Sequence, residues 1–341
     1  MKTLGNAGLL GISKPVEYGG LGLDFSYEVA AVEELGRLQS PGVAMAVGVQ
    51  TLMCTPALAK HGSDELRREF LAPSIAGDQV GCIGVSEEGA GSDVASIRTY
   101  AKKDGDDYII NGKKMWITNS LQADWICLLV NTGEENGPHK NKSLIIVPTD
   151  TPGIERERLD TLGVRSSATT RIYFDNVRVP QRHRVGEEGM GFIYQMEQFQ
   201  EERLYSSARP LLYFENIIQE TIDYARQRII FGQPLLEKQV VKFKLAELKT
   251  KVEGVRSLLY RAVHTYIQGE DVTLLTSMAK YQMGQLAIEL PSALMQHWGG
   301  QGYLNETRVS QVYRDARLGA IAGGASEVML QVIAKEMGMG K

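Results

Sequence analysis

Two short segments combine residue types that could bind a phosphorylated ligand or a thioester. They are Ser86–Asp93 (Ser-Glu-Glu-Gly-Ala-Gly-Ser-Asp) and Lys114–Asn119 (Lys-Met-Trp-Ile-Thr-Asn). The glycines of the first segment let backbone N–H groups approach a pyrophosphate or a thioester without an intervening side chain. Hydroxyls such as that of Thr118 can bond ring or phosphate oxygens, and Trp116 offers a flat apolar wall for a planar ring. A Gly-Ala-Gly-Ser stretch alone usually forms only a turn, so the interpretation depends on the pairing of the two segments.

Four further segments, before and after these two, occur in the order that one enzyme family shows. They are Tyr18–Gly22 (Tyr-Gly-Gly-Leu-Gly), Arg228–Gly232 (Arg-Ile-Ile-Phe-Gly), Gln296–Tyr303 (Gln-His-Trp-Gly-Gly-Gln-Gly-Tyr) and Arg314–Arg317 (Arg-Asp-Ala-Arg). Chance does not readily place so many segments in register over nearly all 341 residues. The chain resembles the acyl-CoA dehydrogenases.

The resemblance implies FAD as the cofactor. The implied cofactor-binding residues are Val85, Ser86, Gly91, Ser92, Trp116, Ile117, Thr118, Arg228, Phe231, Gln239, Gln296, Gly299, Gly300, Ala325 and Glu327. Those from Arg228 to Gly300 reach the ADP end of the cofactor in the family, largely on a neighbouring subunit, which implies a homodimer or homotetramer. Without the resemblance, Arg228 could be only a cation near a helix C-terminus, and Gln296–Tyr303 only a helix end with a glycine-rich turn. Ala325 lacks the hydroxyl of the usual threonine and therefore the side-chain group for one flavin contact of the family.

Dehydrogenation of an acyl thioester needs a base for the α proton and an acceptor for the β hydride. Many family members place a glutamate base after the Arg-Asp-Ala motif, where this chain has Gly323. A smaller group, which includes enzymes of the isovaleryl-CoA, long-chain and citronellyl-CoA type, carries the glutamate before an arginine on an earlier helix. Glu202 stands at that alternative position and is the predicted catalytic base, although a Glu-Glu-Arg run is generally a solvated helix face. Glu201 lies about 100° away around the helix and should point elsewhere.

The resemblance also implies contacts to the acyl-CoA substrate. The backbone N–H of Gly323 is expected to bond the thioester carbonyl and stabilise enolate character as the proton leaves. The other implied substrate-binding residues are Ser92, Ser167, Arg203 and Gly324. Serines in loops such as that of Ser167 more often only form turns. The position of the base favours a branched or long acyl chain, hence fatty acid or branched acyl catabolism, with an electron-transferring flavoprotein as the electron acceptor.

Two rival functions remain open at this stage. A chain without the usual glutamate could be a non-catalytic protein that binds acyl-CoA or flavin. It could also be an acyl-CoA oxidase, whose reduced flavin reacts with oxygen. The carboxylate at Glu202 favours the dehydrogenase over both.

The composition is that of a soluble globular protein, with 43% hydrophobic and 23% charged residues. A net charge of −4 supplies no basic field for nucleic acid. The three cysteines, Cys54, Cys82 and Cys127, are too scattered for a disulfide framework and are expected as core thiols in a reducing compartment. The five histidines show no metal-ligand spacing, so no metal is predicted.

No run of eighteen uninterrupted apolar residues occurs, so we predict no membrane span. The start of the chain does not read as a signal peptide. A location in the cytoplasm of a bacterium or in the mitochondrial matrix of a eukaryote fits these expectations.

Hydrophobic periodicity predicts an α+β fold of helices, then strands, then helices. We expect an N-terminal helical domain over residues 1–79, without the first two helices of the family. The resemblance implies that the middle domain over 80–186 is β-barrel-like and that residues 187–341 form a C-terminal four-helix bundle.

Four local features are specific enough to be tested. Asp24 should cap a helix that contains Phe25, Val29, Val32 and Leu35, and Ser63 should start another. Asn111-Gly112 should form the two-residue turn of a hairpin that delivers Trp116. One long helix should bury a single apolar face, made of Val240, Leu245, Leu248, Val252, Val255 and Leu259.

Overall fold

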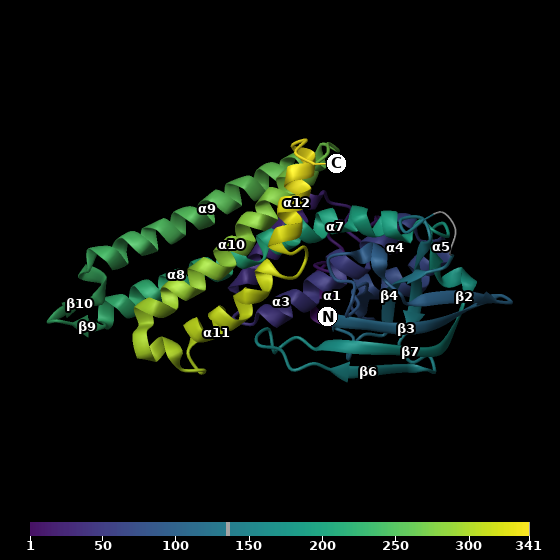
Figure 1. Cartoon of the computed structure of the whole chain (residues 1–341), viewed down its shortest axis with the longest axis horizontal. Coiled ribbons are helices and arrows are strands. Elements are labelled where there is room, and N and C mark those ends of the chain that lie inside the picture. Colours follow the sequence, from purple (N-terminus) through teal and green to yellow (C-terminus); the bar gives the residue numbers. More distant parts are fainter. Residues whose placement is uncertain (134–136, 341) are drawn as a thin grey trace. The chain divides into compact units, whose positions relative to one another are not determined.

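The computed structural model describes residues 1–133 and 137–340, and the chain forms two compact units (Figure 1). The first unit contains Met1–Tyr27, Met45–Thr161 and Arg165–Glu202. The second contains Glu28–Ala44, Leu162–Val164 and Arg203–Lys341. The predicted N-terminal helical domain therefore contributes residues to both units.

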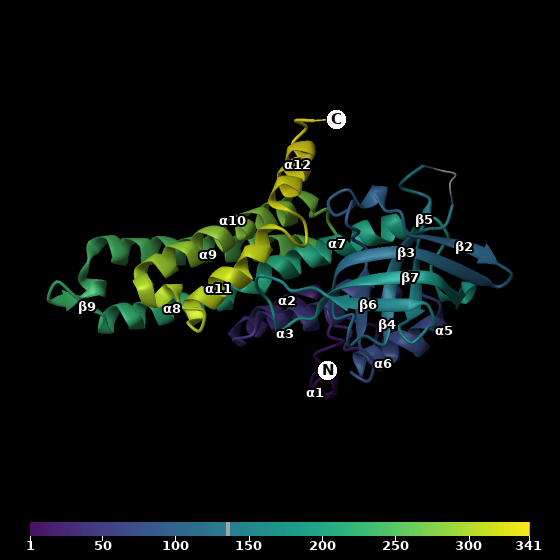
Figure 2. The same ribbon diagram turned by 60° about the horizontal axis from the view of Figure 1, so that its bottom comes forward.

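The first unit combines short helices with one eight-stranded sheet. Its helices are α1 (Lys2–Asn6), α4 (Pro56–His61), α5 (Asp64–Leu66), α6 (Ala72–Ile75) and most of α7 (Gly191–Ala208), while α2 (Phe25–Glu34) and α3 (Pro41–Gly48) have residues in both units. The strands are β1 (Gly81–Gly84), β2 (Tyr100–Asp104), β3 (Asp107–Thr118), β4 (Trp125–Asn131), β5 (Lys142–Pro148), β6 (Ile154–Arg158), β7 (Thr169–Pro180) and β8 (Arg184–Val185). Their order is β6-β7-β3-β2-β4-β5-β8, with β1 parallel to β4, and Figure 2 shows β6, β7 and β3 side by side.

Both predicted helix starts are confirmed. The Asp24 carboxylate accepts a hydrogen bond from the Ser26 N–H at 2.8 Å at the start of α2. The Ser63 hydroxyl accepts one from the Leu66 N–H at 3.2 Å at the start of α5. Each side chain satisfies a backbone donor that the first turn of a helix leaves without a partner.

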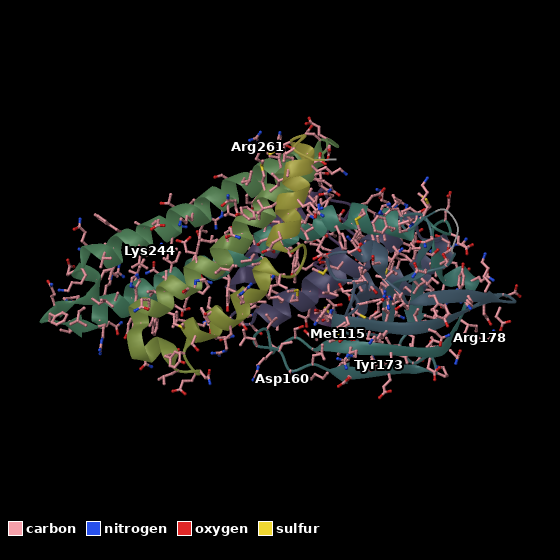
Figure 3. The ribbon with its side chains drawn as sticks, viewed as in Figure 1. Met115, Asp160, Tyr173, Arg178, Lys244 and Arg261 are labelled. Atoms are coloured by element: carbon pink, nitrogen blue, oxygen red, sulfur yellow. The ribbon has the colours of Figure 1, made fainter. Side chains whose placement is uncertain are left out.

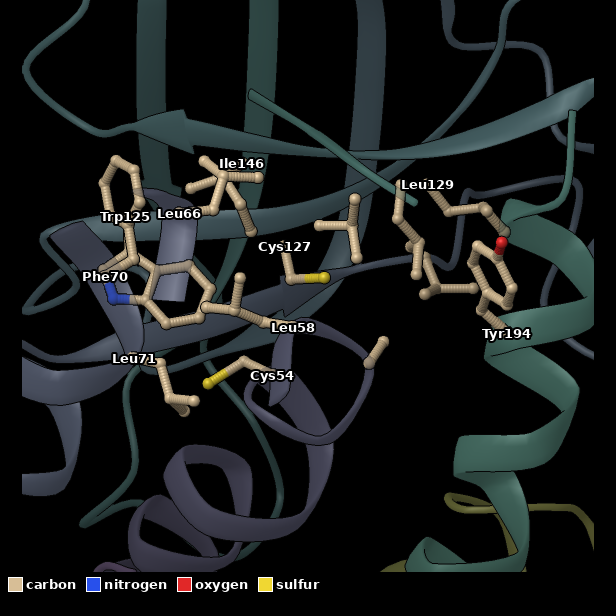
Figure 4. Packing of buried hydrophobic residues seen from close by; sticks show 14 of the residues in the cluster. Cys54, Leu58, Leu66, Phe70, Leu71, Trp125, Cys127, Leu129, Ile146 and Tyr194 are labelled. Carbon is tan, nitrogen blue, oxygen red and sulfur yellow. The ribbon is translucent and has the colours of Figure 1, made fainter. Parts of the chain in front are cut away.

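The core of the first unit lies between the short helices and β4 and β5, whose residues are buried except the last of each strand. Figure 4 shows Trp125 beside Phe70, with Leu58, Cys54 and Cys127 in the same cluster. All three cysteines of the chain are buried and free, as predicted. Burial raises the pKa of the Cys127 thiol to about 12, so this sulfur behaves as a small apolar group.

The predicted hairpin at Asn111-Gly112 is wrong, because β3 runs straight through these residues. The turn lies instead at Gly105-Asp106, between β2 and β3. Asn111 accepts a hydrogen bond from the Asn176 N–H at 2.9 Å, where the β3–β7 register shifts. A Cβ on Gly112 would lie 2.6 Å from the Thr99 hydroxyl oxygen, so the glycine serves a close approach inside the sheet rather than a turn.

The stretch Pro41–His61 passes the length and composition test for a membrane span. However, 78% of its most apolar window is buried inside the protein. Core helices of soluble proteins pass the same test, so packing in the core accounts for this apolar stretch.

The second unit is a helical bundle. It contains α8 (Pro210–Gln227), α9 (Gln239–Ile267), α10 (Thr273–Trp298), α11 (Arg308–Ala316) and α12 (Ser326–Glu336), and a small hairpin of β9 (Ile229–Ile230) and β10 (Gln233–Pro234) joins α8 to α9. Helix α10 contacts each of the other four (Figure 1).

The predicted apolar face of α9 is confirmed at five of its six positions. Leu245, Leu248, Val252, Val255 and Leu259 are buried. Val240 is exposed, and its neighbour Val241 is buried instead. Val241 lies four residues before Leu245, which continues the alternating spacing of four and three residues along one helix face. Val240 lies five residues before Leu245 and therefore falls outside that face.

Replacing Arg256 by methionine should destabilise the protein by about 2–3 kcal/mol. The Arg256 guanidinium donates to carboxylates of Glu33 (2.8 Å), Glu215 (3.0 Å) and Glu253 (2.6 Å), and its side chain is only 19% exposed. The variant leaves these acids without their shared cation. Lys249, which also contacts Glu215 and Glu253 but is 46% exposed, provides the control, and K249M should cost less than about 1 kcal/mol. Urea unfolding measures both, and equal losses would contradict the ranking.

Candidate active site

The glycine-rich segment Ser86–Asp93 follows β1 and is held by its own turn and by a buried carboxylate. Glu87 and Ala90 exchange backbone hydrogen bonds at 3.2 and 3.0 Å, which closes the turn. The Glu87 carboxylate accepts hydrogen bonds from the backbone N–H groups of Arg98 (2.7 Å) and Thr99 (3.0 Å). The loop is therefore tied to the chain that follows it, and its glycines stay exposed.

A buried ion pair joins this loop to β3. The Lys114 ammonium donates to Glu87 Oε1 and to the Val85 carbonyl, both at 2.9 Å. Burial lowers the pKa of Lys114 to about 8, and the negative charge of Glu87 opposes that shift. Next to Lys114 on β3, the Met115 N–H donates to the Ser86 carbonyl at 2.9 Å (Figure 3 labels Met115). The two segments singled out in the sequence are thus neighbours in space.

Trp116 stands at a bulge in β3. Lys114 pairs with Ile172 and Ile117 with Thr170, so two residues of β3 face one residue of β7. Trp116 adopts a φ of 61°, and its side chain remains 50% exposed. Large non-glycine residues seldom adopt positive φ, and such residues cluster at functional sites. The bulge presents the indole at the surface instead of in the sheet.

The space beside Trp116 suits a planar ligand that carries phosphates. A Cβ on Gly91 would lie 3.9 Å from the Trp116 ring, and one on Gly89 would meet no atom within 4 Å. A pocket of about 640 Å³ adjoins the loop at Gly89 and is lined by Tyr100 and Tyr173, among others, but not by Trp116 or the other predicted cofactor-binding residues (Figure 3 labels Tyr173). Glycine backbone, hydroxyls and an exposed indole are groups that a flavin with its pyrophosphate could use.

Two of the predicted cofactor-binding side chains face the core instead. Val85 and Ile117 are buried, and Val85 belongs to the apolar core cluster. Only their backbone groups remain to contact a ligand. Ser86 and Thr118 are half-buried and Ser92 is exposed, so their hydroxyls are accessible.

Ser167 lies in a second, smaller pocket of about 290 Å³. Its hydroxyl is buried, and it has no hydrogen-bond partner among the residues that the structure describes. Arg158 and Arg165 line the same pocket, together with Asp160, which Figure 3 labels. Because Arg165 is paired with Asp160 at 2.9 Å, the pocket offers a phosphate chiefly the Arg158 guanidinium and the Ser167 hydroxyl.

Helix α7 carries Glu201, Glu202 and Arg203, all half-buried. Sequence reasoning missed Gln198, which shares a helix face with Glu202 because the two are four residues apart. The buried amide of Gln198 accepts a hydrogen bond from the Ala57 N–H at 3.1 Å and donates to the Met53 carbonyl. Gln198 thus restrains the rotation of α7 one turn before Glu202.

In the second unit, the predicted ADP-binding residues gather at one end of the bundle. Arg228, Phe231, Gln239, Gln296, Gly299 and Gly300 are all exposed. Tyr224 near the end of α8 stacks on Trp298 at the end of α10, with ring centroids 4.1 Å apart. The Trp298 indole N–H donates to the Thr221 hydroxyl at 3.0 Å. This stack keeps the ends of α8 and α10 together.

The loop between α11 and α12 carries Gly323 and Gly324, which have φ values of 64° and 97°. Both glycines are half-buried. Ala325 occupies the N-cap position of α12, and Glu327 is exposed in the first turn of that helix. The Lys280 ammonium on α10 donates to carbonyls of this loop, a contact that sequence reasoning missed. A lone lysine between apolar positions of a predicted helix was the sequence signal that could have indicated this contact.

Three family models match consecutive parts of the chain. They describe the N-terminal domain of the acyl-CoA dehydrogenases (residues 1–78), the middle domain (82–177) and the C-terminal domain (189–338). The chain belongs to the acyl-CoA dehydrogenase family. The predicted family, the fold class and the assignment as an oxidoreductase are therefore confirmed.

Known acyl-CoA dehydrogenases align with nearly the whole chain. The human mitochondrial short-chain specific acyl-CoA dehydrogenase is 35% identical over 336 residues, 98% of this chain and 81% of the relative. The mitochondrial isovaleryl-CoA dehydrogenase of Oryza sativa subsp. japonica is 33% identical over 341 residues, 98% of this chain and 82% of the relative. The structure of butyryl-CoA dehydrogenase from Megasphaera elsdenii aligns with a TM-score of 0.93 at 31% identity, covering 98% of this chain and 88% of that one.

The site residues predicted for this acyl-CoA dehydrogenase fall into separate groups. In the first unit, Ser86, Gly91 and Trp116 form one surface beside the glycine-rich loop. In the second unit, the bundle-end group and the Gly323 loop are distinct. Lys280, which holds that loop, and Gln296 are sixteen residues apart on α10, a separation of about 24 Å along the helix.

Proposed function

We propose that this protein is an FAD-dependent enzyme that oxidises an acyl-CoA thioester to the trans-2-enoyl-CoA. The observation that carries the proposal is that this chain has its candidate base on a different helix from many relatives of the same fold. Position 323, where many relatives have their base, is glycine, and Glu202 on α7 supplies a carboxylate at the alternative position. When bound, FAD supplies the acceptor for the β hydrogen, which leaves the substrate as hydride.

Glu202 is the group that removes the α proton in this proposal. The proton goes to the Glu202 carboxylate, and the electron pair of the C–H bond becomes the new double bond as the hydride leaves. Two features of α7 support the role: Glu202 is half-buried, and Gln198 one turn earlier is anchored through its buried amide. A base held in one direction loses less entropy when it meets the substrate.

Gly323 binds the thioester carbonyl through its backbone N–H. Loss of the α proton shifts negative charge onto the carbonyl oxygen, and an oriented N–H stabilises that charge. A glycine can play this part because the donor is the main chain. The positive φ of Gly323 and Gly324 supports the use of glycine at both positions.

Different parts of the chain would hold different parts of FAD. Trp116, Gly91 and the hydroxyls of Ser86 and Thr118 suit the ring and pyrophosphate. The exposed bundle-end group, with Phe231 93% exposed, suits the ADP end of a cofactor carried by a second copy. We therefore propose a homodimer or homotetramer in which copies exchange these contacts.

The remaining expectations concern the substrate and the electron acceptor. We propose a branched or long acyl chain, because Glu202 stands where the isovaleryl and long-chain types place their base. The buried Ser167 and the exposed Arg158 and Arg165, which line one pocket, would take a phosphate of CoA. An electron-transferring flavoprotein would accept the electrons, in the bacterial cytoplasm or the mitochondrial matrix.

An anaerobic titration tests the proposal. The purified protein should show flavin absorbance, and one class among short, branched and long acyl-CoAs should bleach the oxidised-flavin band. A yellow protein that no acyl-CoA bleaches would favour a binding protein. Bleaching followed by rapid peroxide formation in air would favour an oxidase.

A further inference from the structure

We propose that Lys280 is a positioning residue: it holds the loop that presents the Gly323 N–H to the thioester carbonyl. The inference rests on the proposed function, because it concerns the geometry of one donor in that reaction. The contacts that carry it lie entirely within the second unit.

Lys280 holds the loop on both sides of Gly323. Its side chain is 2% exposed, and its ammonium donates to the Gly319 carbonyl at 2.7 Å and to the Gly324 carbonyl at 3.1 Å. Gly323 lies between these two residues in the chain. One cation thus sets the distance between the two ends of the loop.

The face of α10 around Lys280 is shaped to receive the loop. Gly284 and Ala287 follow Lys280 by four and seven residues, so the three share one helix face. A Cβ on Gly284 would lie 2.9 Å from the Ser326 hydroxyl and 3.4 Å from the Ala320 Cα. A Cβ on Gly319 would lie 3.0 Å from the Cβ of Ala287. The loop therefore packs directly on α10, and small residues on both sides permit the approach.

Within the loop, the N–H groups of Ile321 and Ala322 donate to the Leu318 carbonyl at 2.9 Å, and these two bonds end before Gly323 and Gly324. Gly323 and Gly324 adopt φ values of 64° and 97°, and glycine is free to adopt many others. A main-chain donor stabilises a developing oxyanion only within about 2.7–3.1 Å of that oxygen. Lys280 restricts the glycines to the conformation in which the N–H is presented.

Burial of a lysine in this place is also costly unless its charge is bonded. An ammonium removed from water needs acceptors for its protons, and backbone carbonyls provide them. Methionine would fill similar space but would leave the Gly319 and Gly324 carbonyls without this donor. The interaction is therefore specific to the charged head and not to the bulk of the side chain.

The test compares K280M with K280R and with a control, K142M, in the full-length protein. Lys142 is also buried, and its ammonium donates to the Pro138 carbonyl at 2.7 Å, but it lies in the β sheet of the first unit. Two quantities are measured for each variant. They are amide hydrogen exchange of residues 319–325 without substrate, and the rate constant of anaerobic flavin bleaching at saturating acyl-CoA.

We expect K280M to exchange faster at residues 319–325 and to bleach about 10-fold or more slowly, with flavin content and half-saturation little changed. K280R should recover part of both, and K142M, which lies in the other unit, should leave the exchange of residues 319–325 unchanged. Unchanged exchange, or faster exchange with wild-type bleaching, would overturn the proposal. If no acyl-CoA bleaches the wild type, the proposed function has failed, while exchange still decides whether Lys280 holds the loop. Should K280M not fold, K280Q is judged by the same criteria.

Discussion

E202Q should keep its flavin and lose reduction by acyl-CoA. Glutamine has the shape of glutamate but cannot accept the α proton, and removal of a general base typically costs about 10²–10⁴ in rate. Because Gln198 anchors α7 independently, the substitution should leave the helix in place. Stopped-flow bleaching of the oxidised-flavin band, normalised to flavin content, measures the effect.

E201Q is the matched control for this prediction. Glu201 is adjacent on α7 and equally half-buried, but it faces about 100° away from Glu202. Its variant should reduce flavin within about threefold of the wild type, since glutamine keeps the shape of the side chain and this position faces away from that of Glu202. Wild-type bleaching by E202Q would show that another residue is the base. Loss of bleaching in E201Q alone would assign the role to Glu201.

K114M should destabilise the protein by about 3–5 kcal/mol, because it leaves the buried carboxylate of Glu87 without its cation. The ammonium of Lys114 also donates to the Val85 carbonyl, so the glycine-rich loop should loosen and flavin affinity should fall. The neighbouring pair provides the control. Lys113 contacts Glu88 at 3.1 Å on the exposed surface, and K113M should cost less than about 1 kcal/mol. Urea unfolding and flavin retention on dilution measure both effects.

The loss in K114M should depend on pH. Burial raises the pKa of Glu87, but Lys114 and the bonds from Thr99 and Arg98 lower it more, so it lies below its usual value. The wild-type carboxylate therefore stabilises the fold above the usual glutamate pKa, and this contribution is lost as the pH falls through the folded-state pKa. In K114M burial should raise that pKa instead, so the cost is present at neutral pH and relieved on acidification.

The difference in unfolding free energy between wild type and K114M should accordingly shrink between about pH 7 and pH 4. The double variant K114M/E87Q, which removes the uncompensated charge, should recover part of the loss at pH 7. A pH-independent difference would mean that lost packing, and not the unpaired carboxylate, causes the destabilisation.

Local sequence patterns were sufficient for most elements of the fold. The caps at Asp24 and Ser63 depend on neighbouring residues, and each is where the sequence predicted it. The Asn111-Gly112 turn failed because the same dipeptide also suits a bulge. Its partners, Thr99 and Asn176, are distant in the sequence, and only the sheet brings them together.

By itself the sequence determined the family, the fold class and the residue types available for chemistry, since motifs and periodicity are local properties of the chain. The tertiary structure alone revealed how those residues are held: Lys114 on Glu87, Gln198 at the start of α4, and Lys280 on the Gly323 loop. These contacts join residues 27 to 141 positions apart. A buried polar side chain is stable only with a partner, and which partner it meets is decided by packing, not by its neighbours in the chain.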